Sequence, residues 1–373
     1  MTTPDSELSA SREPRTFDFQ DTHKVWKGYD EGTVLIKKLI RRFDAYQRGH
    51  STAAFTIGVV KKYVEDRGPN LAALLAYYGV LSVFPLLLVL FTVLGLLFSH
   101  DPGLQHRVIH SALSQFPVVG KQLDGHDGIT ELREKGLGLA LGLVTLFWGS
   151  IGVTRAGQRA MADVWNVPQL NRPHSVRRIG RSVEFLGVLV LDVVLSTVLA
   201  GLVTFDPHAV WIQTLAVIVG LAINVALFLL GFRILTPNSI ATKTLLTGAV
   251  IAALGWNALQ YLGTWLVGHE LRHASQLYGY FASILGLVFF LYLAAEITLI
   301  AAEINVVKSR HLYPRSLQPP FTSADEAVLT AIARQSQRSA AQNVRVEFDR
   351  SGKQVLESDS SNELDATPWS DET

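Results

Sequence analysis

Three acidic residues interrupt otherwise apolar stretches of this chain: Asp192, Glu296 and Glu303. An ionisable side chain inside a membrane span costs roughly 2.5–3.5 kcal/mol on insertion scales, so each of them needs a partner or a water-filled cavity. Glu296 and Glu303 are seven residues apart, which places both on the same stripe of one helix. Arg233, near the end of another apolar stretch, is the expected cationic partner of Glu303. These side chains predict a polar path through an apolar bundle.

Amide side chains extend this candidate path, because they occupy further positions inside the apolar stretches. The alternative is that the polar groups make hydrogen bonds between helices and only hold the bundle together. The residues of the predicted path are Asp192, Asn224, Arg233, Asn257, Gln260, Glu296 and Glu303.

Several other kinds of chemistry are excluded by the residue types. The chain has no cysteine, so it has no disulfide, thiol nucleophile or thiolate metal site. His269, Glu270 and His273 have the spacing of a zinc-protease motif, but they fall in a polar loop without an evident third ligand. No phosphate-binding loop, dinucleotide fingerprint or nucleophile elbow occurs. We therefore expect no enzymatic activity, no metal and no cofactor, and the net charge of +1 argues against a nucleic-acid partner.

The longest apolar stretch, Leu71–Phe98, has no charged side chain and is longer than the about 20 residues that a helix needs to cross the hydrocarbon core. It is the first predicted membrane span. Pro85, near its middle, removes a backbone donor and displaces a carbonyl group one turn earlier, which predicts a kink. Ser82 is close enough to donate back to the helix carbonyls. The kink is either part of the polar path or a tolerated bend.

Five further apolar stretches predict five more spans. The stretch 136–154 is short and rich in glycine, so another helix is expected to approach it closely. The basic residues from Arg155 to Arg181 are expected in the loop that follows it. The predicted fold class is all-α, a polytopic membrane protein whose transmembrane domain, 71–310, has six helices at about 71–98, 136–154, 183–205, 210–235, 244–267 and 280–307.

Polar regions flank the spans on both sides. Residues 1–70 are expected to be cytoplasmic and to contain two basic amphipathic helices, the second near 52–64, which either lie on an anionic membrane surface or pack against the end of the bundle. Residues 311–373 are expected to form a largely disordered cytoplasmic tail, apart from a helix with a capping box at Ser323 and Glu326. Lysine and arginine are dense in alternate loops, which predicts that both termini are cytoplasmic.

Four motifs carry a resemblance to a known family: AYYGVLSVFPL (76–86), MADVWNVP (161–168), LYGYFASILG (277–286) and LIAAEIN (299–305). On these motifs, residues 50–310 resemble the YihY/BrkB family of bacterial inner-membrane proteins, and within it the branch known as YhjD. Alanine at 301 departs from the family's usual glycine, which bears only on close packing there. The resemblance implies six spans. Members were once labelled ribonuclease BN, a label that finds no support in this sequence, and others have been tied to serum resistance or to export of lipopolysaccharide-type lipids.

The resemblance and the polar path together favour a transporter or flippase-like protein of the bacterial inner membrane that moves an amphipathic, lipid-type envelope molecule. The expected partners are membrane lipids and a lipid-type cargo. The alternative is a non-transporting membrane scaffold, whose cytoplasmic helices and tail recruit partners for envelope synthesis.

Overall fold

The computed structural model describes residues 38, 40–97, 136–172, 180–185, 187–189, 191–192, 195, 210–237, 239–269, 276–318, 320–339, 342 and 344–348. In parts of these helices, including 84–97 and 276–283, it describes the backbone alone. Every regular element within the described ranges is a helix, which confirms the predicted all-α class for this part of the chain.

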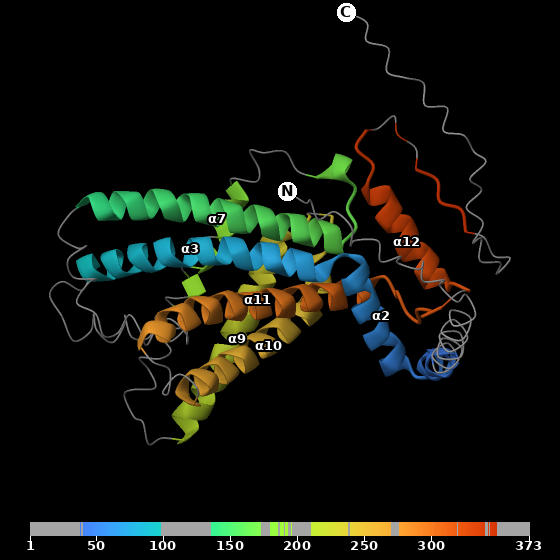
Figure 1. Cartoon of the computed structure of the whole chain (residues 1–373), viewed down its shortest axis with the longest axis horizontal. Coiled ribbons are helices and arrows are strands. Elements are labelled where there is room, and N and C mark those ends of the chain that lie inside the picture. The colour runs from blue at the N-terminus through green and yellow to red at the C-terminus, as the bar shows by residue number, and fades with distance from the viewer. Residues whose placement is uncertain are drawn as a thin grey trace, which may run out of the picture.

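Within the described ranges, five long helices form the body of the molecule (Figure 1). Helix α3 (Gly68–Leu97) packs against both α7 (Gly136–Val164) and α11 (Gln276–Ser309). Helix α10 (Thr242–His269) packs against both α11 and α9 (Val210–Leu235). Long apolar runs form these helices because a helix satisfies its backbone hydrogen bonds internally, even where no water is present.

Three helices are long and apolar enough to cross a membrane, judged by length and composition over the described residues: Thr214–Leu235, Thr242–Trp265 and Ile284–Ser309. Only 17% of the first of these windows is buried inside the chain. Trp211 and Tyr261 are 70% and 71% exposed. Apolar helices that expose so much surface are stable against lipid tails and unfavourable in water.

Glycines in α7 let α3 approach closely, as the sequence predicts. A Cβ atom on Gly152 would lie 2.6 Å from the ring of Tyr78, and one on Gly149 would lie 3.1 Å from the Cα atom of Ser82. Both values are shorter than an ordinary contact, so a larger residue at either position would push the two helices apart.

The first predicted span continues through its proline. Ser82 Oγ donates to the carbonyl oxygen of Gly79 at 2.9 Å, which confirms the predicted bond back to the helix. Helix α3 extends past Pro85 to Leu97. The side chain of Pro85 lies outside the described residues, so the kink remains a prediction.

Helix α7 extends well beyond the predicted end of its span. The expected loop at Arg155 and Arg159 is wrong, because both residues lie on this helix. Alanine, arginine, glutamine and methionine, all good helix formers, dominate 155–162, so the helix outlasts the apolar run. It is followed by Asn166, whose φ of 48° is left-handed, and by a short 3-10 turn, η2 (Gln169–Asn171).

Residues 51–65 of the N-terminal region pack on one end of the bundle. Helix α2 (Ser51–Glu65) lies against α11 and α3. A Cβ atom on Gly58 would lie 3.1 Å from the carbonyl oxygen of Leu312, so the contact is close. Of the two alternatives for 52–64, the structure shows packing against the bundle. We call the end where α2 meets the C-terminal ends of α7 and α11 the α2 end. Helical backbone is also described at 40–49 and in parts of 180–195.

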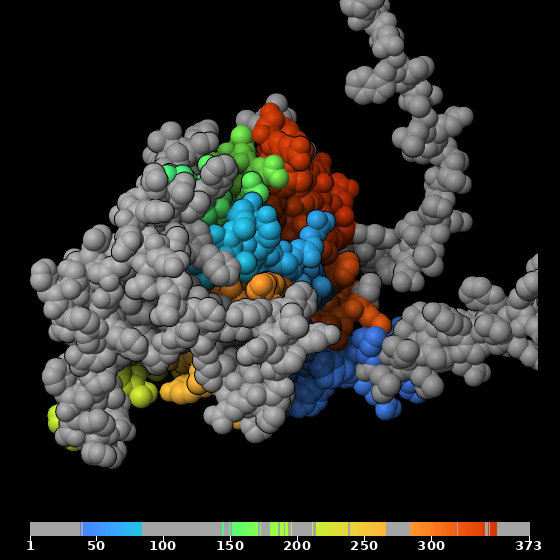
Figure 2. Space-filling view, turned by 60° about the vertical axis from the view of Figure 1, so that its left-hand side comes forward, coloured from blue at the N-terminus to red at the C-terminus, as the bar shows by residue number. Residues whose placement is uncertain are grey.

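Helix α12 (Ser323–Gln335) also lies at the α2 end, where Figure 2 shows it in red beside the cyan start of α3. Its N-cap is Thr322, whose hydroxyl accepts from the backbone N–H of Asp325 at 3.2 Å. In return the carboxylate of Asp325 accepts from the backbone N–H of Thr322 at 3.0 Å. The capping box predicted at Ser323 and Glu326 is therefore wrong by one residue, because tertiary contacts hold Asp325 at the N3 position.

Those tertiary contacts form a buried ionic network. Arg315 Nε and Lys61 Nζ both donate to Asp325 Oδ1, at 2.6 and 2.7 Å. The backbone N–H of Ser316 donates to Asp325 Oδ2 at 2.8 Å, and Arg315 also binds Glu65 at 2.8 Å. Burial opposes the charged carboxylate, but these donors outweigh it and hold the pKa of Asp325 well below its ordinary value of 3.8.

We expect Asp325→Asn to remove an acid-sensitive part of the stability. A carboxyl group whose pKa is lower in the folded than in the unfolded state stabilises the folded protein. This stabilisation is complete at a pH above the unfolded-state pKa, and it is lost as the pH falls toward the folded-state pKa. Between about pH 5 and pH 3 the wild type should therefore lose roughly 1–2 kcal/mol more than the variant. Denaturant titrations of the full chain in detergent across this pH range measure the difference.

Glu347→Gln removes an exposed carboxyl group and should leave the pH dependence of the wild-type stability unchanged. Equal slopes for Asp325→Asn and wild type would contradict the prediction.

Candidate functional site

A buried lysine joins two carboxylates at the α2 end. Lys62 Nζ lies 3.0 Å from Glu303 Oε2 and also forms an ion pair with Asp66. It donates to the carbonyl oxygen of Val164 at 2.7 Å as well. The side chains of Lys62 and Glu303 are both 0% exposed. This one side chain therefore ties α2 to α7 and α11. We call Lys62, Asp66, Asn166 and Glu303 the Lys62 cluster.

Two chain reversals position the rest of the cluster, one between α2 and α3 and one at Asn166 after α7. Between α2 and α3, Arg67 adopts a left-handed φ of 58°. The next residue is Gly68, where a Cβ atom would lie 2.0 Å from the ring of Tyr63. This turn leaves Asp66 facing the end of α7, where Asn166 Nδ2 donates to Asp66 Oδ1 at 3.1 Å.

The cluster places two carboxylates around one ammonium group. A second cation stands farther away: the guanidinium of Arg310 lies 5.5 Å from the centre of the Trp165 ring and donates to the Trp165 carbonyl at 3.0 Å. Burial lowers the pKa of Arg310, and the charge of Asp66 opposes this shift. With both carboxylates ionised, the buried group would carry one more negative than positive charge, so it is a place where a proton or a cation can bind.

A tyrosine from α2 holds the other acid of α11. The hydroxyl of Tyr63 donates to Glu296 Oε2. Burial, together with this hydrogen bond, raises the pKa of the Tyr63 hydroxyl above its ordinary value of 10.0, so Tyr63 remains a donor at physiological pH. Both acids that the sequence places on one stripe therefore face α2, where they meet the consecutive residues Lys62 and Tyr63.

Arg233 is not the partner of Glu303. Its Nη1 donates to the carbonyl oxygen of Ile240 at 2.9 Å, across the turn between α9 and α10. The predicted pairing was wrong because it considered only residues of the apolar stretches. The fold instead brings Lys62, from a segment that precedes the first span, into contact with Glu303.

The remaining residues of the predicted path lie on other helices. Asn257 Nδ2 donates to the carbonyl oxygen of Ala253 at 2.7 Å, within its own helix. A path that joins these positions to Glu296 and Glu303 remains a prediction. The other members are half-buried: Asp192, Asn224 and Gln260.

Sequence reasoning missed Lys62, Asp66 and Asn166. Lys62 has the position of a solvated residue on a surface helix, and the other two have the positions of turn residues. One signal did exist, because Asn166 belongs to the motif MADVWNVP and Glu303 to the motif LIAAEIN. These are two of the four motifs that carry the family resemblance, and they meet in one buried cluster.

The site offers no evident metal-binding group. Within the described ranges, no set of three or more His, Cys, Asp or Glu side chains could hold a metal ion. His273, of the zinc-protease-like motif, lies outside those ranges. The absence of enzymatic activity and of a cofactor remains an expectation.

Comparison with known proteins supports a membrane family. The family model described as Virulence factor BrkB matches residues 59–325, a range that includes the whole Lys62 cluster. The chain is 27% identical over 268 residues to the inner membrane protein YhjD of Escherichia coli (strain K12), covering 67% of this chain and 79% of that protein. No solved structure matches the chain.

A second relative is longer than this chain. The chain is 24% identical over 303 residues to a UPF0761 membrane protein of Psychrobacter sp. (strain PRwf-1), covering 75% of this chain and 53% of the relative. The chain thus spans about half the length of that protein. Because the family match covers most of its residues, and because its exposed apolar helices suit a bilayer, the chain belongs to the YihY/BrkB family of membrane proteins.

Proposed function

We propose that this chain is a transporter or flippase-like protein that moves an amphipathic, lipid-type envelope molecule across the bacterial inner membrane. In this proposal six helices cross the membrane and both termini lie in the cytoplasm. Support comes from the alternation of basic loops along the sequence and from a relative that is named an inner membrane protein. The α2 end is then the cytoplasmic end of the bundle.

The observation that carries the proposal is the Lys62 cluster. Glu303 belongs to an apolar helix, whereas Lys62 and Asp66 belong to the segment that precedes the first span. A purely structural ion pair needs one acid for one base, and a second buried acid adds a desolvation cost. If a proton or cation neutralises one carboxylate, Lys62 is held less tightly, which loosens α2 from α11. The cluster is thus suited to coupling ion binding to movement of the helices.

Glu303→Gln tests this role in reconstituted vesicles. Vesicles of phosphatidylethanolamine and phosphatidylglycerol would carry a trace of fluorescent phosphatidylglycerol, and dithionite bleaching would report its movement between leaflets. We expect the wild type to exceed protein-free vesicles. Glu303→Gln should slow movement at least about tenfold, which corresponds to about 1.4 kcal/mol on the barrier. Insertion and protein amount should stay normal.

Glu184→Gln is the matched control, because this carboxylate is exposed and should keep the wild-type rate. Asp192→Asn extends the test to the predicted path and should also slow movement. If Glu303→Gln and Asp192→Asn both move lipid at the wild-type rate, the polar path is refuted. If the wild type is no faster than protein-free vesicles, the lipid-type cargo is refuted.

A scaffold role is favoured by one separate observation. Phe43 and Tyr46, on the helical segment 40–49, are 54% and 58% exposed beside the exposed Arg41 and Arg42. Such a mixed basic and aromatic surface suits a protein or membrane contact. The Glu303→Gln variant separates the two functions, since a scaffold does not depend on a neutralisable acid inside the bundle.

A further inference from the structure

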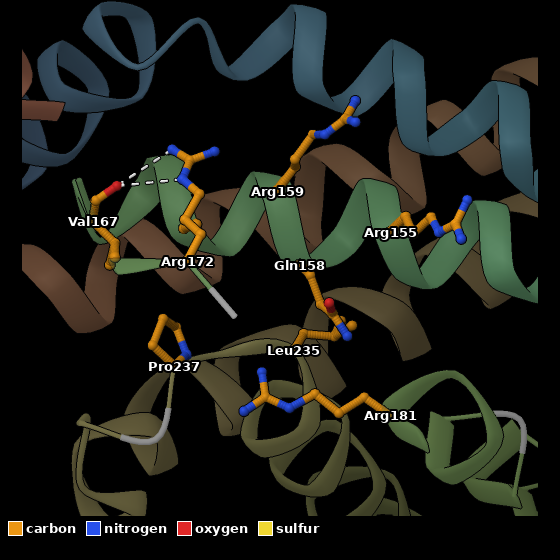
Figure 3. A pocket seen from close by; sticks show the side chains of 9 residues that line it. Arg155, Gln158, Arg159, Val167, Arg172, Arg181, Leu235 and Pro237 are labelled. Carbon is orange, nitrogen blue, oxygen red and sulfur yellow. Dashed lines mark hydrogen bonds between the residues drawn. The ribbon is translucent and has the colours of Figure 1, made fainter. Parts of the chain in front are cut away.

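A second candidate site lies between α7 and the end of α9 (Figure 3). Its cavity measures about 30 Å³ and is partly open to the surroundings, so it can enclose a small polar group rather than a whole ligand. Four arginines line it and no acidic residue does. The lining residues that matter here are Arg155, Gln158, Arg159, Arg172, Arg181 and Leu235.

The positive charge of this pocket is only partly compensated. Arg172 Nη2 binds Asp163 at 2.6 Å, so its charge is paired. Arg155 and Arg159 are exposed and have no ion pair within the described part of the chain. They are four residues apart on α7, where like charges on the same face destabilise a helix. A negatively charged ligand would relieve this repulsion.

A buried amide also faces the pocket without a partner. Gln158 is 8% exposed, and neither the oxygen nor the nitrogen of its side-chain amide has a hydrogen-bond partner. Figure 3 shows it extending from α7 toward Leu235, with the side chain of Arg181 below it. A buried amide that lacks partners is unfavourable, so a ligand that supplies both an acceptor and a donor would stabilise this site.

We propose that this pocket binds the phosphate group of an anionic phospholipid from the adjacent membrane leaflet. Arg155 follows directly on the apolar stretch 136–154, which places the arginines at the level of the lipid headgroups. Basic pockets between membrane helices suit such headgroups. This inference rests on the proposed function, because it assigns a chemical class to the lipid-type cargo.

The chemistry of each side chain matches this ligand. An arginine guanidinium presents parallel N–H donors that fit two oxygens of one phosphate. The Gln158 side chain donates through its nitrogen to a phosphate oxygen and accepts through its oxygen from a headgroup hydroxyl, such as those of glycerol. Leu235 and Pro237 form an apolar wall for the carbon atoms of the lipid.

The test counts lipids bound to the full chain in detergent by native mass spectrometry. Phosphatidylglycerol is compared with phosphatidylcholine of the same acyl chains, and inorganic phosphate is titrated separately. We expect the wild type to bind one phosphatidylglycerol at least about tenfold more tightly than phosphatidylcholine. The double variant Arg155→Gln/Arg159→Gln should lose this preference. The neutral change Gln158→Leu should weaken it several-fold without altering the charge.

Arg334→Gln/Arg338→Gln is the control, because it removes the same charge from two exposed positions four residues apart outside the pocket and should keep the preference. Unchanged melting temperatures without lipid would show that the variants fold. Equal binding of the two lipids by the wild type, or an intact preference in Arg155→Gln/Arg159→Gln, would overturn the proposal. If the protein bound inorganic phosphate but did not bind phosphatidylglycerol, the proposal that the ligand is a lipid would be overturned. This test measures lipid binding alone, whereas the vesicle test of Glu303→Gln measures lipid movement. A failure of the pocket proposal can therefore be told apart from a failure of the proposed transport function.

Discussion

Replacing Lys62 by methionine is expected to lower the free energy of unfolding by about 3–5 kcal/mol. Methionine has a similar length, but it leaves the carboxylates of Asp66 and Glu303 buried without their ammonium partner. It also removes the ammonium group that donates a hydrogen bond to the carbonyl oxygen of Val164 at 2.7 Å. Denaturant titration of the full chain in detergent micelles, followed by tryptophan fluorescence, measures this loss.

The double variant Lys62→Met/Glu303→Gln should recover part of that loss, because it removes one of the two uncompensated charges. Lys243→Met changes an exposed lysine at the start of α10 and should cost less than about 0.5 kcal/mol. If Lys62→Met lowered the free energy of unfolding no more than Lys243→Met, the Lys62 cluster would not be what holds α2 on the bundle.

Gly248→Ala is expected to lower the free energy of unfolding by about 3 kcal/mol, although this exchange normally favours a helix. A Cβ atom on Gly248 would lie 2.3 Å from the carbonyl oxygen of Ala301 and 2.8 Å from Cγ of Asn305. These are backbone and hydrogen-bonded atoms that cannot easily move. The backbone N–H of Gly248 also donates to Asn305 Oδ1 at 2.7 Å, and separating the helices would break that bond. The same titration in detergent measures the change.

Gly187→Ala is the matched control, because no atom lies within 4 Å of the position of its Cβ. This exchange should be neutral or stabilise the protein by up to about 1 kcal/mol. A loss for Gly187→Ala equal to that of Gly248→Ala would refute close packing of α10 on α11 as the cause.

The helices themselves could be predicted from local composition. Helix α9 (Val210–Leu235) has the bounds expected for the stretch 210–235, because an apolar run whose one charged residue is Arg233 begins and ends there. Helix α7 is the exception, since helix-forming residues continue it past its apolar part to Val164. That extension carries two arginines of the pocket, which the sequence placed in a loop.

The candidate site could be predicted only in part. Glu296 and Glu303 stand out because a charged residue in an apolar run is costly wherever the chain folds. Their partners do not stand out, because Lys62 and Tyr63 belong to a polar segment that is unremarkable by composition. The capping box of α12 shows the same limit: two candidate pairs one residue apart fit the sequence, and the buried bond from Arg315 to Asp325 selects one.

The sequence by itself determined that this protein is helical and suited to a membrane. It also determined which acidic residues lie inside apolar stretches, where a charged side chain is costly. These properties follow from runs of neighbouring residues, whose transfer into lipid is a nearly local free energy. The tertiary structure alone decided that Lys62 pairs with Glu303 and that Gln158 faces a pocket of arginines. Such contacts join residues far apart in the chain, and their energies depend on distance and burial, which only the packing of the helices sets.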